Sequence, residues 1–132
     1  MSKLQTPFRY DFVGSFLRPQ ALKDAKAAYR DGKITKEEFD KVVNEEITKV
    51  VEKQKELGFH AITDGEFRRT FWHLDFMWGF DGVAHENTGN GVKFDAELAV
   101  LDDTYLVGKI KAKAHPFVEY FKFLKQFEDE NT

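Results

Sequence analysis

The segment from residue 34 to residue 63 carries a helix pattern followed at once by a strand pattern, which restricts the possible folds more than any other feature. Thr35 and Glu38 have the spacing of a capping box, in which each side chain satisfies a free N–H of the other residue. Gly58 predicts the end of the helix, and the apolar residues 59–63 predict a short buried strand. Apolar residues at three- and four-residue steps give the helix one broad stripe: Phe39, Val42, Val43, Ile47, Val50, Val51 and Leu57.

Another strand is predicted before this helix. Phe12 and Val13 form a short apolar run that ends in a tight turn at Gly14 and Ser15. Pro19 can open a first helix over residues 21–30, because its missing N–H would be unsatisfied there anyway. A strand, a helical crossover and a strand in one sheet imply parallel pairing with a right-handed connection. The sequence therefore predicts an α/β fold whose two parallel strands end at one sheet edge, where such folds bind ligands.

The second half of the chain predicts fewer regular elements. The aromatic stretch at residues 71–80 is interpreted as core or subunit interface, with a pocket for a flat ligand as the alternative. Residues 84–91 have turn chemistry and predict a loop, whereas residues 92–94 and 105–110 predict extended segments that could pair as an antiparallel hairpin. A C-terminal helix is expected from Pro116, and no interdomain linker is visible, so we expect a single domain over residues 1–132. The apolar face of that helix would contain Phe117, Tyr120, Phe121, Leu124 and Phe127.

Composition excludes several classes of function. The net charge is −3 and Lys and Arg are interleaved with Asp and Glu, so the chain has no basic footprint for nucleic acid. The absence of Cys excludes a disulfide framework and any site built on thiolates of this chain. No window approaches the roughly 18 continuous apolar residues of a membrane helix, and residues 1–8 show no cleavable leader. We expect a cytoplasmic protein that binds neither nucleic acid nor a membrane.

Two motifs lie at the predicted sheet edge. Residues 64–69, Asp-Gly-Glu-Phe-Arg-Arg, place two carboxylates and two guanidinium groups where a strand ends. A carboxylate there could hold a substrate ammonium and an Arg could clamp a carboxylate, while the alternative is a solvated turn. Gly14 and Ser15 could present backbone N–H groups and a hydroxyl to a ligand. The alternative is a strand-to-helix turn in which Ser15 is a local cap.

Three segments in order resemble a known family. They are residues 12–19 (Phe-Val-Gly-Ser-Phe-Leu-Arg-Pro), residues 62–69 (Ile-Thr-Asp-Gly-Glu-Phe-Arg-Arg) and residues 72–76 (Trp-His-Leu-Asp-Phe). Together they look like the start of the short, single-barrel relatives of cobalamin-independent methionine synthase. Residues 107–110 and the pair His115–Pro116 fit the same stretch of those proteins, so the resemblance spans nearly the whole chain.

The resemblance implies part of a (β/α) TIM barrel and a zinc-dependent methyl transfer in methionine biosynthesis. In that family zinc binds homocysteine as a thiolate, which attacks the methyl group of a methyltetrahydrofolate. Homocysteine or methionine and a methyltetrahydrofolate are therefore the expected small-molecule partners. By resemblance, the amino-acid end of homocysteine is held at the positions matching Val13, Gly14, Ser15 and Glu66. The other candidate substrate-binding residues match the same local pattern and are Asp64, Arg18, Arg68 and Arg69.

The chain differs from the family in its zinc ligands. The family's zinc ligands are a His, a Glu and two Cys on later barrel strands, and this chain contains no Cys. Because a complete barrel needs around 250 residues, we expect a truncated N-terminal part that binds no zinc by itself and holds half of a binding site. One reading is a methyltransferase acting on homocysteine or another thiol, with the rest of the barrel absent or supplied by a partner chain. The alternative is a catalytically inactive remnant that acts as a structural or interaction module, which exposed sheet edges would make a homo-oligomer.

Overall fold

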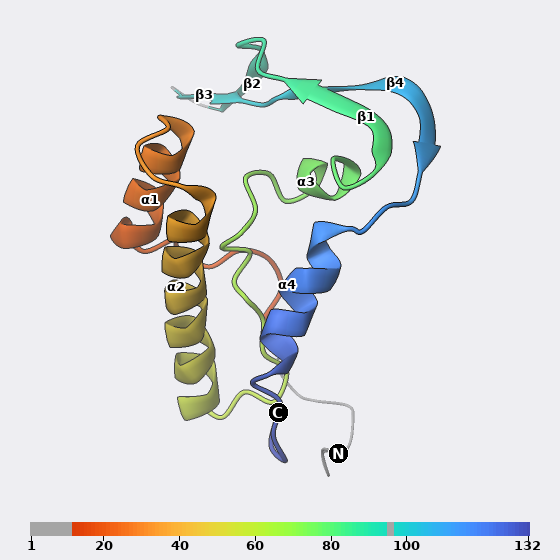
Figure 1. Ribbon diagram of the computed structural model, residues 1–132. Helices are drawn as coiled ribbons and strands as arrows, with labels where there is room; N and C mark the ends of the chain where they lie inside the picture. Colours follow the sequence, from red (N-terminus) through yellow and green to blue (C-terminus); the bar gives the residue numbers. More distant parts are fainter. Residues whose placement is uncertain (1–11, 95–96) are drawn as a thin grey trace. The chain divides into compact units, whose positions relative to one another are not determined.

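The computed structural model describes residues 12–94 and 97–132, which divide into two compact units. The first unit runs as far as Arg68 and also includes Phe123–Thr132, and the second comprises Arg69–Lys122. The first contains helices α1 (Gln20–Arg30) and α2 (Lys36–Glu56) (Figure 1). The second contains α3 (Leu74–Met77), β1 (Asp81–Glu86), β2 (Gly91–Phe94), β3 (Glu97–Val100) and β4 (Asp103–Lys111). Helix α4 (Pro116–Lys125) begins in the second unit and ends in the first. The single domain expected over the whole chain stays a prediction.

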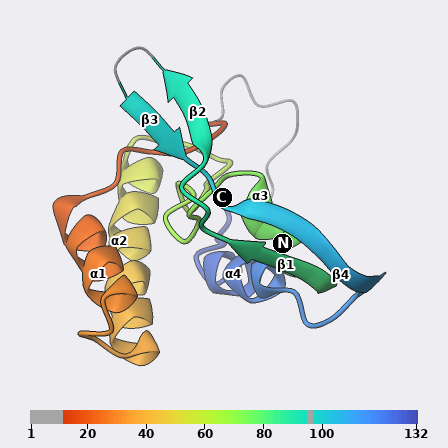
Figure 2. The same cartoon turned by 90° about the horizontal axis from the view of Figure 1, so that it is seen from above.

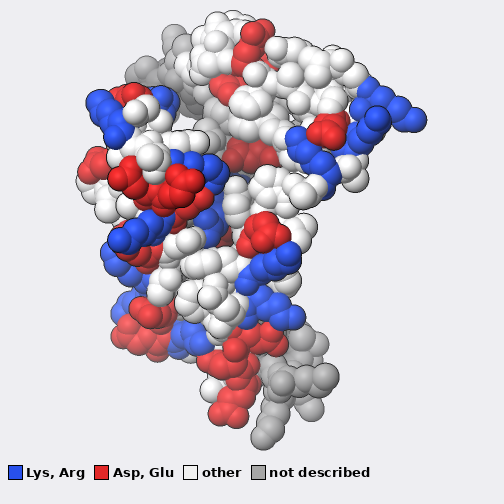
Figure 3. Space-filling model, viewed as in Figure 1, with Lys and Arg blue, Asp and Glu red and all other residues white. Residues whose placement is uncertain are grey.

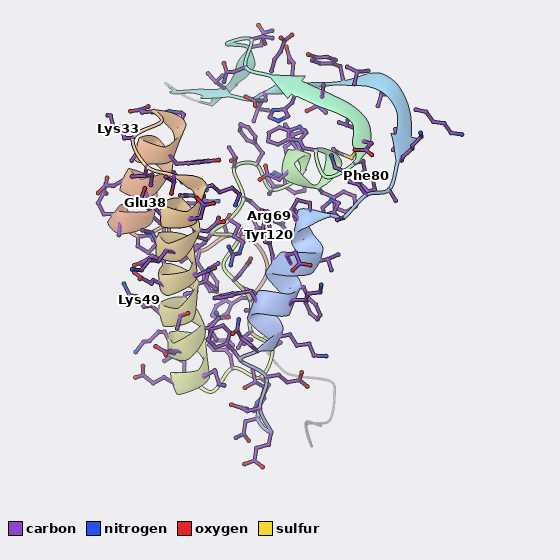
Figure 4. The ribbon with its side chains drawn as sticks, viewed as in Figure 1. Lys33, Glu38, Lys49, Arg69, Phe80 and Tyr120 are labelled. Carbon is purple, nitrogen blue, oxygen red and sulfur yellow. The ribbon has the colours of Figure 1, made fainter. Side chains whose placement is uncertain are left out.

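The predicted capping box is present at the start of α2. The Thr35 backbone N–H donates to the Glu38 carboxylate at 2.8 Å, and the Glu38 N–H donates to the Thr35 hydroxyl at 3.2 Å; Figure 4 labels Glu38. After the helix, Gly58 has a φ of 80°, the left-handed conformation that suits a glycine at a helix end. The apolar stripe is confirmed at its centre, although Leu57 at its end is exposed. The core side chains, each at most 1% exposed, are Leu22, Val43, Ile47, Val51 and Phe67.

A polar side chain is buried on the same helix, at a position that the apolar stripe does not include. Gln54 is 3% exposed. Its amide nitrogen donates to the Thr63 carbonyl at 2.8 Å, and its amide oxygen accepts from the Thr63 N–H at 3.0 Å. A neighbouring strand would offer one carbonyl and one N–H to Thr63 in the same way. Gln54 therefore takes the place of a strand partner for the segment that leaves α2.

The two parallel strands of the prediction are not formed among the described residues. Residues 12–13 have no regular structure, and Val13 is 93% exposed rather than buried. Residues 59–63 are also irregular, and at Thr63 the Gln54 side-chain amide on α2 bonds the backbone N–H and carbonyl that a strand partner would use. The two segments still lie together, since the Phe16 N–H donates to the Gly65 carbonyl at 3.1 Å. The chain is thus a mixed α/β structure, but the regular strand pairs of the described residues are antiparallel.

The strands of the second unit form two separate two-stranded sheets. β1 pairs with β4 and β2 pairs with β3, so the chain runs out along β1 and β2 and returns along β3 and β4 (Figures 1 and 2). The extended segments predicted at residues 92–94 and 105–110 are confirmed, but the expectation that they pair with each other is wrong. The loop predicted at residues 84–91 is wrong for residues 84–86, which belong to β1, and for Gly91, which begins β2. Residues 84–86 form a strand despite their turn-like composition because they pair with β4, and the strand preference of a residue depends on the neighbouring strand.

Helix α4 begins at Pro116, as predicted, but its apolar face is only partly buried. Three side chains of its C-terminal end and the following turn pack against the core of the first unit: Phe123, Leu124 and Phe127. Phe121, which the sequence placed on the same face, is exposed. The helix therefore supplies core contacts from its last turn rather than from a continuous stripe.

Charged side chains of both signs are interspersed over the described surface in Figure 3. On α2, Lys49 lies 2.5 Å from the Glu46 carboxylate. Lys55, also on α2, lies 2.5 Å from the carboxylate of Asp129 and, together with the Asn131 N–H, lowers the pKa of Asp129 to about 2. Within the described ranges, no helix is both long and apolar enough to cross a membrane.

Replacing Gln54 with Met would keep the length of the side chain and remove both hydrogen bonds to Thr63. We expect the free energy of unfolding to fall by about 1–3 kcal/mol, because the backbone groups of Thr63 lose their partners. Urea unfolding followed by far-ultraviolet circular dichroism measures this change. Gln20→Met, at an exposed position of α1, is the control and should change stability by less than about 0.5 kcal/mol. Equal effects of the two substitutions would contradict the role given to Gln54.

Candidate functional site

The two sequence motifs meet in the first unit. The Ser15 hydroxyl donates to the Glu66 carboxylate at 3.2 Å, across 51 residues of sequence. One backbone hydrogen bond, from the Phe16 N–H to the Gly65 carbonyl, joins the segments beside this contact. Ser15 is exposed and Glu66 is half-buried, so the pair lies at the surface. The structure therefore confirms that the motifs share one location, although not through two parallel strands.

A tight turn presents the Glu66 carboxylate. Gly65 and Glu66 have φ angles of 64° and 58°, both in the left-handed region. The Glu66 N–H donates to the Asp64 carboxylate at 2.9 Å, which closes the turn. Gly65 is buried, and a Cβ there would lie 3.0 Å from the ring of Phe16 and 3.1 Å from that of Phe67. The turn therefore requires glycine for its backbone conformation and for space.

Arg18 reaches the same residue from the first motif. Its guanidinium Nη2 donates to the Glu66 backbone carbonyl at 3.2 Å. The start of this motif is open to solvent: Val13 is exposed, and Gly14 has a φ of 89° with free space around its Cα. The described site thus consists of an open turn at residues 13–15 and a Glu66 held from both sides.

The two remaining arginines make other contacts. The Arg68 guanidinium donates to the Asn44 side chain on α2 at 2.5 Å and lies 5.0 Å from the centre of the Phe123 ring. Arg69 belongs to the second unit, where it donates to a backbone carbonyl of residue 72 and lies 4.8 Å from the Phe117 ring near the start of α4 (Figure 4). The structure brings Ser15, Arg18, Asp64 and Glu66 together. A ligand role for Arg68 and Arg69 stays a prediction.

Sequence reasoning missed a polar cluster in the second unit. The His85 imidazole stacks on the Trp78 ring at 3.7 Å between centres, and its Nδ1 lies 2.8 Å from the Asp102 carboxylate. The Trp78 indole N–H donates to the Thr104 hydroxyl at 2.9 Å. No local signal could reveal this cluster, because its partners are brought together by the pairing of β1 with β4.

The residues of this chain do not fit the zinc site that the resemblance implies. The sequence contains no Cys. Across residues 12–94 and 97–132, no group of three or more His, Asp or Glu side chains is placed to hold a metal ion. The donor set for a zinc-bound thiolate is therefore not supplied by the described residues.

The fold and the paired motifs agree with a match to a family model. Residues 9–96 match the model described as cobalamin-independent synthase, catalytic domain. Because the match covers most of the chain, the chain belongs to this family.

Three relatives place the chain within the family. It is 38% identical to the uncharacterized protein YxjH of Bacillus subtilis, over 97% of this chain and 34% of that protein. It is 34% identical to the 5-methyltetrahydropteroyltriglutamate–homocysteine methyltransferase of Thermotoga maritima, over 58% of this chain and 10% of that enzyme. A solved structure of a proposed vitamin-B12-independent methionine synthase from Listeria monocytogenes has a TM-score of 0.75 at 40% identity, over 98% of this chain and 36% of that one. The chain thus spans about a third of the length of YxjH and of the Listeria protein.

Replacing Arg68 with Ala tests whether this side chain is structural. The substitution removes the hydrogen bond to Asn44 and the contact with the Phe123 ring, so we expect the free energy of unfolding to fall by about 1–3 kcal/mol. Urea unfolding provides the measurement, and Arg30→Ala, at a largely exposed position, is the matched control with an expected change below about 0.5 kcal/mol. An Arg68 that served a ligand alone would leave stability unchanged.

Proposed function

We propose that the surface formed by Ser15 and Glu66 holds the amino-acid end of a thiol substrate, homocysteine, in a methyltransferase of this family. The supporting observation is the 3.2 Å contact between the Ser15 hydroxyl and the Glu66 carboxylate, which joins the two motifs. A fixed carboxylate attracts the substrate ammonium, and backbone N–H groups of the open turn at Gly14 and Ser15 can donate to the substrate carboxylate. The Thermotoga relative supports the choice of substrate, since it is named as a homocysteine methyltransferase.

The proposal assigns binding and orientation to this chain. The methyl donor is a 5-methyltetrahydropteroyltriglutamate, by the name of the same relative, and the product is methionine. We further propose that the segments at residues 12–19 and 59–66 belong to the first part of a (β/α) barrel, in which their polar ends share one edge. Activation of the substrate thiol is not assigned to any described residue.

Replacing Glu66 with Gln tests the proposed ammonium contact. The amide retains an acceptor for the Ser15 hydroxyl but carries no charge, so we expect affinity for homocysteine and methionine to fall by about tenfold to a hundredfold. Isothermal titration calorimetry measures both ligands against the wild-type chain and the variant. A third titration with N-acetylmethionine, which has no ammonium, should give no binding to either.

The control for this experiment is Glu52→Gln, which makes the same change of charge at an exposed position of α2. It should bind as the wild-type chain does. Retention of wild-type affinity by Glu66→Gln would remove Glu66 from the proposed site. A wild-type chain that binds neither amino acid would contradict the proposed function itself.

A second candidate, a structural or interaction module that self-associates, is favoured by apolar side chains on β4. Every residue of this strand is exposed, and Leu106, Val107 and Ile110 are each more than half exposed. Water-exposed apolar strands are commonly covered by another chain. We expect sedimentation equilibrium over the micromolar range to detect a dimer or larger species. A monomer at every concentration would contradict this candidate.

A further inference from the structure

Glu66 has a backbone conformation that its residue type does not favour. Among the described residues it is the one non-glycine residue with a positive φ, 58°. In the left-handed region the Cβ of an L-residue crowds the following carbonyl, so such a residue persists only where its surroundings hold it. The conformation aims a carboxylate at the exposed hydroxyl of Ser15. The groups that hold the backbone of Glu66 therefore decide where its carboxylate lies.

Two side chains hold the peptide groups on either side of this Cα. Asp64 accepts from the Glu66 N–H at 2.9 Å through Oδ1, and Arg18 donates to the Glu66 carbonyl at 3.2 Å through Nη2. Each bond involves the backbone of Glu66, so neither depends on the ligand. The sequence makes Asp64 and Arg18 candidates for direct contact with the substrate. Their hydrogen bonds to the backbone of Glu66 indicate that they hold this residue instead.

The surrounding residues limit how far the turn can relax. Phe67, directly after Glu66, is 1% exposed in the core, and Gly65, directly before it, is buried against two aromatic rings. The Gly65 N–H donates to the Thr63 hydroxyl at 3.2 Å. The chain is thus fixed on both sides of Glu66, and the remaining freedom is rotation of the peptide groups that Asp64 and Arg18 hold.

We propose that Asp64 and Arg18 are positioning residues, which hold Glu66 in the left-handed conformation and thereby set the affinity of the site for an amino-acid ammonium. This inference rests on the proposed function for the ligand, but its structural part concerns the free protein. Asp64 and Arg18, which were expected to contact the ligand directly, would instead act through Glu66. The negative charge of Asp64 has no part in this role, because a neutral amide oxygen accepts the same backbone hydrogen bond.

The negative charge of Asp64 distinguishes a positioning role from direct contact with the ligand. Asp64→Asn keeps the acceptor and removes the charge, whereas Asp64→Ala removes both. Positioning predicts homocysteine affinity within about twofold of wild type for Asp64→Asn and a loss of about tenfold or more for Asp64→Ala. Direct contact with the ammonium predicts that both variants lose affinity alike. Asp24→Ala, at an exposed position of α1, is the matched control and should bind as the wild-type chain does.

The structural part is measured without ligand. The Glu66 ¹³Cα chemical shift and the coupling between its amide and Hα protons report φ in solution. Both should keep their left-handed values in wild type and Asp64→Asn and lose them in Asp64→Ala and Arg18→Ala. Unchanged values in the two alanine variants would overturn the proposal, and so would equal loss of affinity in Asp64→Asn and Asp64→Ala.

Two further features keep the test decisive. If Asp64→Ala fails to fold by circular dichroism, Arg18→Ala and Arg18→Lys take its place, with Arg18→Lys expected to recover part of the affinity because an ammonium can still donate to the Glu66 carbonyl. If the wild-type chain binds no amino acid, the proposed function fails, while the resonance measurements still decide whether Asp64 and Arg18 set the conformation of Glu66.

Discussion

Gln54 presents a buried amide to the backbone of Thr63, and the turn that carries Glu66 begins at the next residue. Gln54 lies on the long helix α2, whose neighbouring side chains form the core. Its hydrogen bonds therefore fix the position of residues 63–66 relative to that helix. Phe67 enters the same core immediately after the turn. The candidate site is thus held between two buried contacts of one structural unit, while its polar groups lie at the surface.

Features that depend on neighbours along the chain could be predicted from the sequence. The capping box of Thr35 and Glu38 and the helix end at Gly58 are local hydrogen-bonding and backbone preferences, and both are present. The meeting of Ser15 with Glu66 was also expected, from a strand-helix-strand pattern and from the family resemblance. The two residues do meet, although the strands are absent from the described residues. The bond from the Phe16 N–H to the Gly65 carbonyl joins the two segments, and the Gln54 amide fixes Thr63 to α2.

Features that depend on partners distant in sequence could not be predicted. Nothing in the composition of α2 shows that Gln54 turns inward, because the partner of its amide is the backbone of residue 63, which lies outside the helix. The β1–β4 sheet of the second unit joins residues 81–86 to residues 103–111, and turn-like residues become a strand through that pairing. The charges of residues 64–69 indicated binding chemistry, but not that Arg18 and Asp64 contact the backbone of Glu66 or that Arg68 contacts Asn44.

The crowding around Gly65 has a consequence for how this surface responds to change. A methyl group at that position would press on the ring of Phe16, which directly follows Ser15 in the chain. Steric pressure there would be transmitted to the hydroxyl of Ser15 and to the carboxylate of Glu66 together. A defect at Gly65 would resemble the loss of a ligand contact, although Gly65 has no side chain with which to make one. Substitutions across this surface can therefore change ligand binding through steric crowding between the rings of Phe16 and Phe67 as well as through the chemistry of the polar groups.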